Sequence, residues 1–296
     1  MIAPNPSPVL PPMLELDYYR LCNADLRAYS DEHLIAHYQR FGEPEGRRSN
    51  SIATRIDFAA LVPRDAHSLE IGPFYNPLLR GPNTKYFDRQ TQAELISRAA
   101  SLQMPTGGVP HIDFVSHTCD LTIVDETFDN VFSSHCIEHN PDLIGHLQIV
   151  ERLLVPGGRY FVIAPDKRYC FDHYRAPSTI ADVIPAHEER RTLHTLANVL
   201  GSHVLSTHND CGRHWAGDHG SYMAESERRT REGLGQYQQA AGTYLDLHGW
   251  FFTPASAKAL FCQLPPLGYT SLKLERLYPT RRDQNEFWFV LRKECA

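Results

Sequence analysis

Short apolar runs alternate with helix-like repeats along most of the chain from about residue 55 onward. Apolar runs bounded by polar residues, Gly or Pro predict five strands, at residues 67–71, 84–87, 114–118, 130–134 and 159–164. Pro141 and Asp142 suit the first turn of a helix that continues to Leu154, and VPGG at 155–158 is expected to end it in a turn. The strand at 159–164 is almost continuously apolar, which is typical of a sheet covered on both faces.

The same alternation returns near the C-terminus. Thr253 suits the cap of a helix and Pro254 its first turn. Residues 269–277 and 286–292 predict two further strands, and their short link requires an antiparallel pair. The pattern therefore predicts an α/β fold with a Rossmann-like, seven-stranded, mostly parallel sheet whose last strand is antiparallel. Such an ending is unusual for a dinucleotide-binding domain.

Two segments depart from this rhythm. Residues 1–52 combine a loose Pro-rich tail, expected over 1–13, with a small helical module at 14–49, in which Ser30 is a candidate N-cap and Gly42 a candidate stop. Residues 180–248 are rich in His, Arg, Gly and Gln and predict a mostly helical insertion on the substrate side. We expect residues 53–296 to form the main domain around this insertion.

Composition narrows the functional classes. Of the 296 residues, 42 % are hydrophobic, which suffices for a core, and the net charge of −6 argues against a broad nucleic-acid-binding face. The first residues lack the basic and apolar regions of a signal peptide, and no apolar run is long enough to span a membrane. Seven scattered cysteines without a CxxC pair fit a reducing cytoplasm.

Acidic residues lie at or just after the ends of three of the predicted strands. Glu70 precedes a Gly-Pro turn at Gly72, Asp88 ends YFD, and Asp120 lies in TCDL. Open α/β sheets bind ligands at the carboxyl edge of their strands, so we expect these carboxylates to converge on a nucleoside pocket.

The motifs at these strand ends resemble class I S-adenosylmethionine-dependent methyltransferases over about residues 66–175 and 250–292. The matching segments occur in the family's order: LEIGPF, YFD, CDL, FDNVFSSHCIEH and LLVPGGRYFVIAPD. PDKRYCFD further resembles a subgroup found beside bacterial polysaccharide-assembly genes. The module YYRLCNADL…HYQRFGEPEGR resembles one that accompanies glycosyltransferases, which implies a contact with a glycan-assembly enzyme through residues 14–49.

The resemblance implies S-adenosylmethionine as cofactor and a set of residues around it. Gly72 would let the backbone approach the methionine part, although Phe74 stands where the family usually has a second glycine. Asp88 would accept the ribose hydroxyls, and Asp120 and Leu121 would bind the adenine. The expected cofactor-binding residues are Glu70, Gly72, Pro73, Phe74, Asp88, Arg89, Asp120, Leu121, His135 and Ile137. Glu70 has a second reading, in which it only orients the loop.

Candidate catalytic residues lie after the fourth and fifth strands and in the insertion. His139 is a candidate base, and Asp166 lies at the expected mouth of the site. His219 belongs to HNDCGRHWAGDHG, whose spacing matches no zinc pattern, so we expect no metal there and a histidine-rich substrate lid instead. In that lid Trp215 would offer a face for stacking a sugar. A purely structural role for each of these residues remains open.

These observations favour methyl transfer to a hydroxyl of a sugar or glycan precursor. A nicotinamide-dependent oxidoreductase is the first alternative, but no GxGxxG motif follows the first predicted strand. A non-catalytic protein that keeps the methyltransferase fold and serves as a scaffold is the second.

Overall fold

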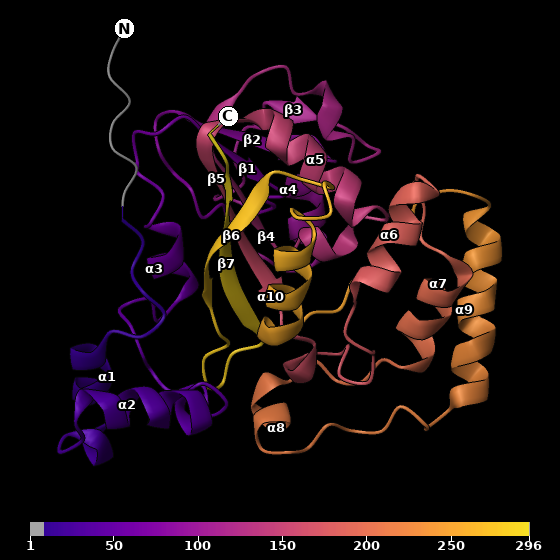
Figure 1. Ribbon diagram of the computed structural model, residues 1–296. Coiled ribbons are helices and arrows are strands. Elements are labelled where there is room, and N and C mark those ends of the chain that lie inside the picture. Colours follow the sequence, from indigo (N-terminus) through magenta and orange to yellow (C-terminus); the bar gives the residue numbers. More distant parts are fainter. Residues whose placement is uncertain (1–8, 296) are drawn as a thin grey trace, which may run out of the picture.

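A seven-stranded sheet forms the centre of the computed structural model, which describes residues 9–295 (Figure 1). The strands are β1 Ser68–Ile71, β2 Thr84–Asp88, β3 Phe114–Val115, β4 Phe128–Ser134, β5 Leu154–Pro165, β6 Leu272–Tyr278 and β7 Glu286–Lys293. Their order is β3-β2-β1-β4-β5-β7-β6. Strands β1 to β5 pair in parallel, and β7 runs antiparallel to both β5 and β6. The predicted fold class is confirmed.

Two predicted boundaries are wrong. The third strand is only two residues long, and VPGG does not end a helix in a separate turn. Helix α5, Leu143–Leu153, passes directly into β5, because Leu154 already pairs with Phe128 of β4. The glycines within VPGG let the chain turn inside the strand, where Gly157 has a φ of 78°.

Helices cover both faces of the sheet (Figure 1). Successive side chains of β5 alternate between two apolar clusters, since a strand points neighbouring residues to opposite faces. Tyr160, Val162 and Ala164 face α5 and α10, which spans Pro254–Gln263. Phe161 and Ile163 face α3, which spans Arg55–Ala59. The remaining helix beside the sheet, α4, spans Gln92–Ser101.

The cap predicted at Thr253 is present, and Asp142, expected in the first turn of its helix, is the N-cap of α5. Thr253 accepts a hydrogen bond from the backbone N–H of Ser256 at the start of α10, and Asp142 accepts one from Gly145 at the start of α5. Short 3₁₀ helices follow several strands or helices: Ala24–Leu26, Leu121–Ile123, Ile137–His139 and Lys167–Tyr169.

The N-terminal module is helical and has a small apolar cluster of its own. It contains α1 Leu16–Cys22, α2 Asp31–His37 and a π-helical turn, Tyr38–Gly42. Ser30 caps α2 as predicted. Leu10 is buried and the carbonyl of Pro11 accepts a hydrogen bond from Tyr278 Oη, so residues 9–13 are not a loose tail; the first eight residues of that predicted tail lie outside the described part. The domain boundary at residue 52 stays a prediction.

The insertion at 180–248 is mostly helical, as predicted. It consists of α6 Ile180–Glu188, α7 Leu196–Val204, α8 Cys211–Trp215 and α9 Ser226–Ala240, with α7 and α9 side by side (Figure 1). Across residues 9–295, none of the helices has the length and apolar character that crossing a membrane requires.

Arg281, in the link between β6 and β7, fastens the N-terminal module to the sheet. It is only 5 % exposed, and its guanidinium donates to Ser49 Oγ, Asn50 Oδ1 and the carbonyls of Arg47 and Ile52 at 2.7–3.0 Å. These acceptors belong to residues 47–52, which connect the N-terminal module to the domain that contains the sheet. The planar fork of arginine therefore holds several backbone segments at one point.

We expect Arg281→Ala to lower the free energy of unfolding by roughly 2–4 kcal/mol, because buried acceptors lose a charged donor. Limited proteolysis should then cleave the chain within residues 40–55. The exposed neighbour Arg282 provides the matched control, and Arg282→Ala should leave both measurements unchanged. Equal protease resistance of the two variants would rule out the fastening role of Arg281.

Candidate active site

The backbone turns sharply where β1 ends, at Gly72. Its φ is 69°, a left-handed value that favours glycine, and its N–H donates to the carbonyl of Phe87 at 2.8 Å. A Cβ at this position would lie 2.6 Å from Cys136 Sγ. The bare backbone corner expected at Gly72 is therefore present, packed against the residues that follow β4.

Three non-glycine residues at this edge of the sheet also have left-handed backbones. Phe74 follows β1 with a φ of 46°, Cys119 follows β3 with 60°, and His135 follows β4 with 52°. Such conformations cost free energy and collect at functional sites, because the surrounding structure must enforce them. All three follow the carboxyl ends of parallel strands, which indicates that the functional site lies at this edge of the sheet.

The three acids predicted to converge serve three different turns instead. Glu70 is 2 % exposed, and its two oxygens accept the backbone N–H groups of Leu78 and Leu79. Asp120 caps the turn Leu121–Ile123 through Thr122. Asp88 follows Phe87, whose carbonyl accepts the Gly72 N–H, and its carboxylate accepts the Gln90 N–H at 3.1 Å. Burial raises the pKa of Asp88, and that of Glu70 to about 7.

The other predicted cofactor residues fall into two groups. Leu121 and Ile137 are buried in the apolar core, so only their backbones could face a ligand, and Pro73 is also buried. Arg89 follows β2 and places its guanidinium 5.2 Å from the centre of the Tyr244 ring. Their role in binding the cofactor stays a prediction.

A strap from the end of the insertion, residues 243–248, crosses the end of β1. Tyr244 Oη donates to the carbonyl of His139 at 3.1 Å, and Asp246 Oδ1 lies 3.0 Å from His139 Nδ1. Asp246 Oδ2 also lies 4.0 Å from Arg89 Nη1. Arg89 follows β2 and His139 follows β4, and β1 lies between these strands. The strap therefore joins the strand ends on the two sides of β1.

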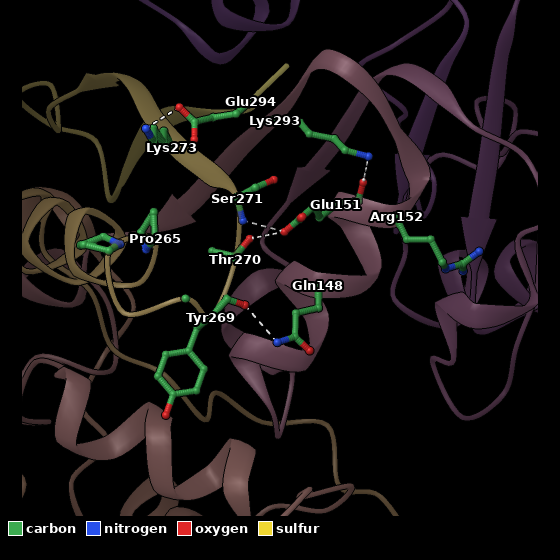
Figure 2. A pocket seen from close by; sticks show the side chains of 12 residues that line it. Gln148, Glu151, Arg152, Pro265, Tyr269, Thr270, Ser271, Lys273, Lys293 and Glu294 are labelled. Carbon is green, nitrogen blue, oxygen red and sulfur yellow. Dashed lines mark hydrogen bonds and ion pairs between the residues drawn. The ribbon is translucent and has the colours of Figure 1, made fainter. Parts of the chain in front are cut away.

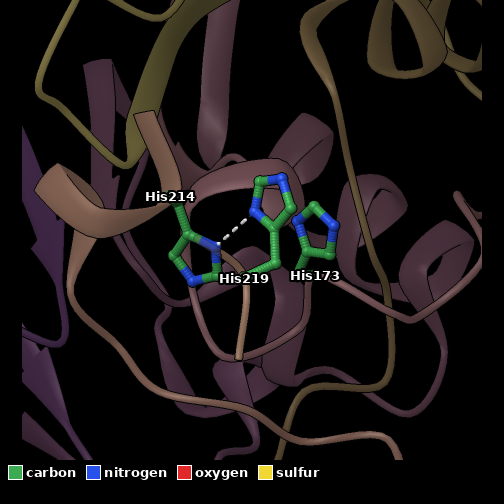
Figure 3. Close-up of side chains that lie close together, drawn as sticks. All are labelled: His173, His214 and His219. Atoms are coloured by element: carbon green, nitrogen blue, oxygen red, sulfur yellow. Dashed lines mark hydrogen bonds between the residues drawn. The ribbon is translucent and has the colours of Figure 1, made fainter. Parts of the chain in front are cut away.

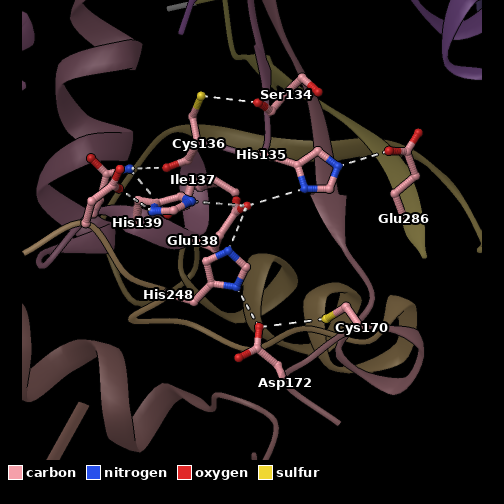
Figure 4. A network of polar contacts seen from close by, with 12 residues as sticks. Ser134, His135, Cys136, Ile137, Glu138, His139, Cys170, Asp172, His248 and Glu286 are labelled. Carbon is pink, nitrogen blue, oxygen red and sulfur yellow. Dashed lines mark hydrogen bonds and ion pairs between the residues drawn. The ribbon is translucent and has the colours of Figure 1, made fainter. Parts of the chain in front are cut away.

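Next to that corner, Glu138 is enclosed by three imidazoles (Figure 4). Its side chain has no exposed surface, and Oε1 lies 3.7 Å from His135 Nδ1 and 3.8 Å from the Nε2 atoms of His139 and His248. Neither carboxylate oxygen has a hydrogen-bond partner within the described residues. We call Glu138 and these three histidines the Glu138 cluster.

Each histidine of the cluster has a carboxylate at its outer nitrogen. Asp172 Oδ2 lies 2.5 Å from His248 Nδ1, Glu286 Oε2 lies 3.0 Å from His135 Nε2, and Asp246 holds His139 as described above. Burial opposes ionisation of His248, but the bond to Asp172 and the charge of Glu138 raise its pKa. The contact with His139 lowers the pKa of Asp246 to about 2.

Sequence reasoning found only part of this cluster. His139 and His135 were expected near the site, and the structure brings them together with Glu138. His248, Asp246 and Glu286 were missed, because they come from segments far from the predicted site along the chain, whereas Asp172 was a weaker candidate at its mouth. The only local signal was the density of histidines between residues 187 and 248, which does not indicate which of them faces the sheet.

Asp166 has a structural environment. Its carboxylate is fully buried and accepts hydrogen bonds from Thr280 Oγ1 at 2.6 Å and from the guanidinium of Arg168 at 2.6–3.1 Å. Both oxygens are engaged, so Asp166 orders the loop after β5 and offers no free carboxylate to a substrate. A direct catalytic role stays a prediction without geometric support.

His219 belongs to a second histidine group, with His173 and His214 (Figure 3). The rings of His173 and His219 stack with centroids 3.8 Å apart, and Nδ1 of His214 lies 3.0 Å from Nδ1 of His219. Trp215, expected to stack a sugar, instead stacks on Tyr169 at 4.0 Å. A catalytic role of His219 stays a prediction.

A hollow of about 770 Å³ lies at the opposite edge of the sheet (Figure 2). It is lined by Glu151 and Arg152 of α5 and by Tyr269–Ser271 before β6. Glu151 is already held there by Thr270 and Ser271. Because the amino ends of the parallel strands meet at this edge, the hollow lies away from the strained loops and the Glu138 cluster.

We expect Gly72→Ala to abolish binding of S-adenosylhomocysteine and to lower the free energy of unfolding by roughly 1–3 kcal/mol. The methyl group would meet Cys136 Sγ in a backbone conformation that alanine disfavours. Calorimetric titration and urea unfolding measure the two effects. Gly235→Ala, in open space on α9, is the control and should be neutral or stabilising. Full binding by the Gly72 variant would contradict the close approach.

The raised pKa of Glu70 gives a pH-dependent prediction. The folded state holds this proton more tightly than the unfolded state, so the contribution to stability is complete below about pH 4.5 and is lost as the pH rises through 7. The destabilisation caused by Glu70→Gln should therefore be larger at pH 5 than at pH 8 in urea unfolding. The exposed Glu43→Gln should show no such difference, and a Glu70 effect that grows with pH would oppose the assignment.

Comparison with known families agrees with the geometry of the sheet. A family model described as a methyltransferase domain matches residues 83–162, from just before β2 into β5. No curated protein matches the chain.

Solved structures resemble the chain only distantly. An S-adenosylmethionine-dependent methyltransferase from Mesorhizobium loti is 14 % identical over 79 % of this chain and 95 % of its own, with a TM-score of 0.39. A complex of DhpI with SAH is 14 % identical over 94 % of both chains, with a TM-score of 0.39. A Rhodobacter sphaeroides protein provisionally assigned to the Zn-dependent alcohol dehydrogenases is 14 % identical over 85 % of this chain and 92 % of its own, with a TM-score of 0.43.

These TM-scores are too low to carry an argument, and the strand order carries the fold instead. A parallel sheet that ends in the antiparallel β7 surrounds the segment that matches the family model. The family model therefore identifies residues 83–162 as part of a methyltransferase domain, and S-adenosylmethionine is the cofactor that such a domain implies.

Proposed function

We infer that the protein transfers the methyl group of S-adenosylmethionine to a hydroxyl of a sugar or glycan precursor. The Glu138 cluster is the observation that supports a hydroxyl group as the methyl acceptor. It places three imidazoles, each beside a carboxylate, next to the turn at Gly72. An alcohol must lose its proton as the new C–O bond forms, whereas a carboxylate acceptor needs little help from a base. A group of histidines poised to take that proton suits the alcohol.

The residues around Gly72 suit the donor. Gly72 has no Cβ, which leaves room for the donor beside the backbone. The buried Asp88 ends β2, where the ribose of the donor would lie. The strap 243–248 lies beside this region through the bond of Tyr244 to His139. S-adenosylmethionine supplies a methyl group already activated on its sulfonium. The protein must then align the acceptor with that group and exclude water, which covering by the strap would favour.

Each cluster histidine carries an orienting carboxylate, which fixes the ring and stabilises the charge that follows proton uptake. Asp246 does this for His139, the base expected from the sequence, and Glu286 does it for His135. Either imidazole would accept the acceptor's proton through the nitrogen that faces Glu138.

The carbohydrate part of the proposal rests on the resemblance of PDKRYCFD and of the module at 14–49 to segments found in polysaccharide assembly. A hollow of about 450 Å³ lies between α6, α7 and residues 249–251, but its aromatic residues Trp250 and Phe251 are buried and offer no open face to a sugar. A glycan-assembly enzyme that docks on residues 14–49, and a reducing cytoplasm that suits seven free thiols, belong to the same proposal.

The two alternatives have less support. The Gly72-Pro73-Phe74 corner does not supply the glycines that a dinucleotide pyrophosphate requires, and β7 is antiparallel. A scaffold without activity would not need three histidines held around one buried carboxylate.

Asp88→Ala should weaken binding of S-adenosylhomocysteine about 30-fold, which corresponds to about 2 kcal/mol for a lost charged acceptor. Isothermal titration calorimetry measures this affinity. Asp65→Ala is a matched control, because Asp65 is exposed and lies at the opposite end of β1. Unchanged affinity in the Asp88 variant would remove that residue from the donor site.

The acceptor is tested by transfer of labelled methyl from S-adenosylmethionine to a panel of nucleotide-linked sugars, simple sugar acids and amines. We expect label only in hydroxyl-bearing sugars, in an ether that resists mild base. Label in an alkali-labile ester or in an amine would contradict the proposed acceptor.

A further inference from the structure

The carboxylate of Glu138 lacks the partners that a buried charge requires. Both oxygens are inaccessible to solvent, and within the described residues neither has a hydrogen bond. The surrounding imidazole nitrogens are 3.7–3.8 Å away, which is beyond hydrogen-bond range. A buried ionised carboxylate without partners costs several kcal/mol, so something must compensate for it.

The orientation of the histidines makes this enclosure more unusual. Asp172 and Asp246 occupy the outer Nδ1 positions of His248 and His139 and therefore favour the proton on those nitrogens. The inner Nε2 atoms of both rings face Glu138 Oε1. A carboxylate oxygen and two ring nitrogens that face one another are a set of potential ligands for a cation.

The dimensions suit a metal ion. One oxygen of Glu138 and one nitrogen each of His139 and His248 all lie within 4.8 Å of one another. Metal–ligand bonds of about 2.0–2.2 Å place tetrahedral ligands about 3.4 Å apart. The Glu138–histidine distances of 3.8 Å need to shorten by only a few tenths of an ångström.

The outer carboxylates complete the pattern. Histidines that bind metals commonly donate their other N–H to a carboxylate, which fixes the ring and raises its basicity. Asp172 serves His248 in this way (Figure 4), and Asp246 Oδ1 lies 3.0 Å from His139 Nδ1. The hydrogen bonds from Gly249 and Trp250 to the carbonyl of Glu138 hold His248 in place, although it lies more than 100 residues along the chain.

We propose that Glu138, His139 and His248 bind a divalent transition-metal cation of the zinc type. Two imidazoles and one carboxylate suit Zn²⁺, Co²⁺ or Mn²⁺, whereas Mg²⁺ and Ca²⁺ prefer oxygen ligands. Three protein ligands leave a position for an acceptor oxygen, whose proton the cation would make easier to remove. This role rests on the proposed function, and His135 remains beside the site to take that proton.

The second histidine group is the weaker candidate. His173 and His219 are stacked face to face, and His214 and His219 are already within hydrogen-bond distance of each other. No buried carboxylate lies among its three members. It serves as the internal comparison for the experiment.

The test is titration of chelator-stripped protein with Co²⁺, followed by visible absorption and by competition with Zn²⁺. The wild type should bind one equivalent tightly, with the absorption bands of a four- or five-coordinate site. Glu138→Gln and His248→Ala should weaken this binding at least 100-fold. His219→Ala and His67→Gln should bind as the wild type does, since His67 lies beside a carboxylate at the opposite edge of the sheet.

Asp172→Asn keeps all three ligands and changes only the support of His248, so we expect a 10- to 100-fold weaker site. Retained binding of S-adenosylhomocysteine shows that each variant is folded. The proposal is overturned if the wild type takes up no stoichiometric Co²⁺, or if His219→Ala alone removes the site.

The outcomes separate this inference from the proposed function. Tight Co²⁺ binding without methylation of any hydroxyl would leave the metal site standing and overturn the acceptor. Methylation of a sugar hydroxyl by chelator-treated protein that binds no Co²⁺ would support the proposed acceptor and overturn the metal site.

Discussion

The backbone carbonyl of Glu138 is the point on which the site depends. It accepts the N–H groups of Gly249 at 2.8 Å and Trp250 at 3.2 Å, and so joins the end of the insertion to the turn that follows β4. These two bonds place His248 and the strap against the sheet, while the side chain of the same residue collects the imidazoles. One short turn thus sets the relation between the parallel sheet, which supplies the donor corner, and the insertion, which lies beside it.

The sheet was predictable because its signals are local. The apolar run at 159–164 must be covered on both faces, and β5 does alternate between two buried clusters. The short link before residue 286 required an antiparallel pair, which is the β6–β7 hairpin. The wrong boundary at VPGG has an equally physical cause. Gly and Pro usually mark turns, but pairing of Leu154 with Phe128 outweighs that preference.

The site was less predictable, since its geometry depends on contacts that span the whole chain. A sequence shows that Glu70, Asp88 and Asp120 follow strands, but it does not show which backbone N–H groups will engage them. Glu70 holds the loop after β1, Asp120 caps a short turn, and Asp88 accepts the N–H of Gln90. Conversely, His248 carries no motif of its own. Its importance follows from the fold, which brings Asp172 to one of its nitrogens and Glu138 to the other.

The strap has a kinetic consequence. Because the strap contacts the strand ends on both sides of β1, residues 243–248 would have to lift away before a donor bound at the Gly72 corner could leave. The contacts of Asp246 with Arg89 and Arg98 are long, at 4.0 and 3.9 Å, and partly exposed, so they oppose lifting only weakly. The shorter contacts of Asp246 with His139, at 3.0 Å, and of His248 with Asp172, at 2.5 Å, provide the main resistance. Exchange of donor for product would then be timed by the opening of this segment, and the turnover rate would report the motion of the insertion rather than the speed of bond formation.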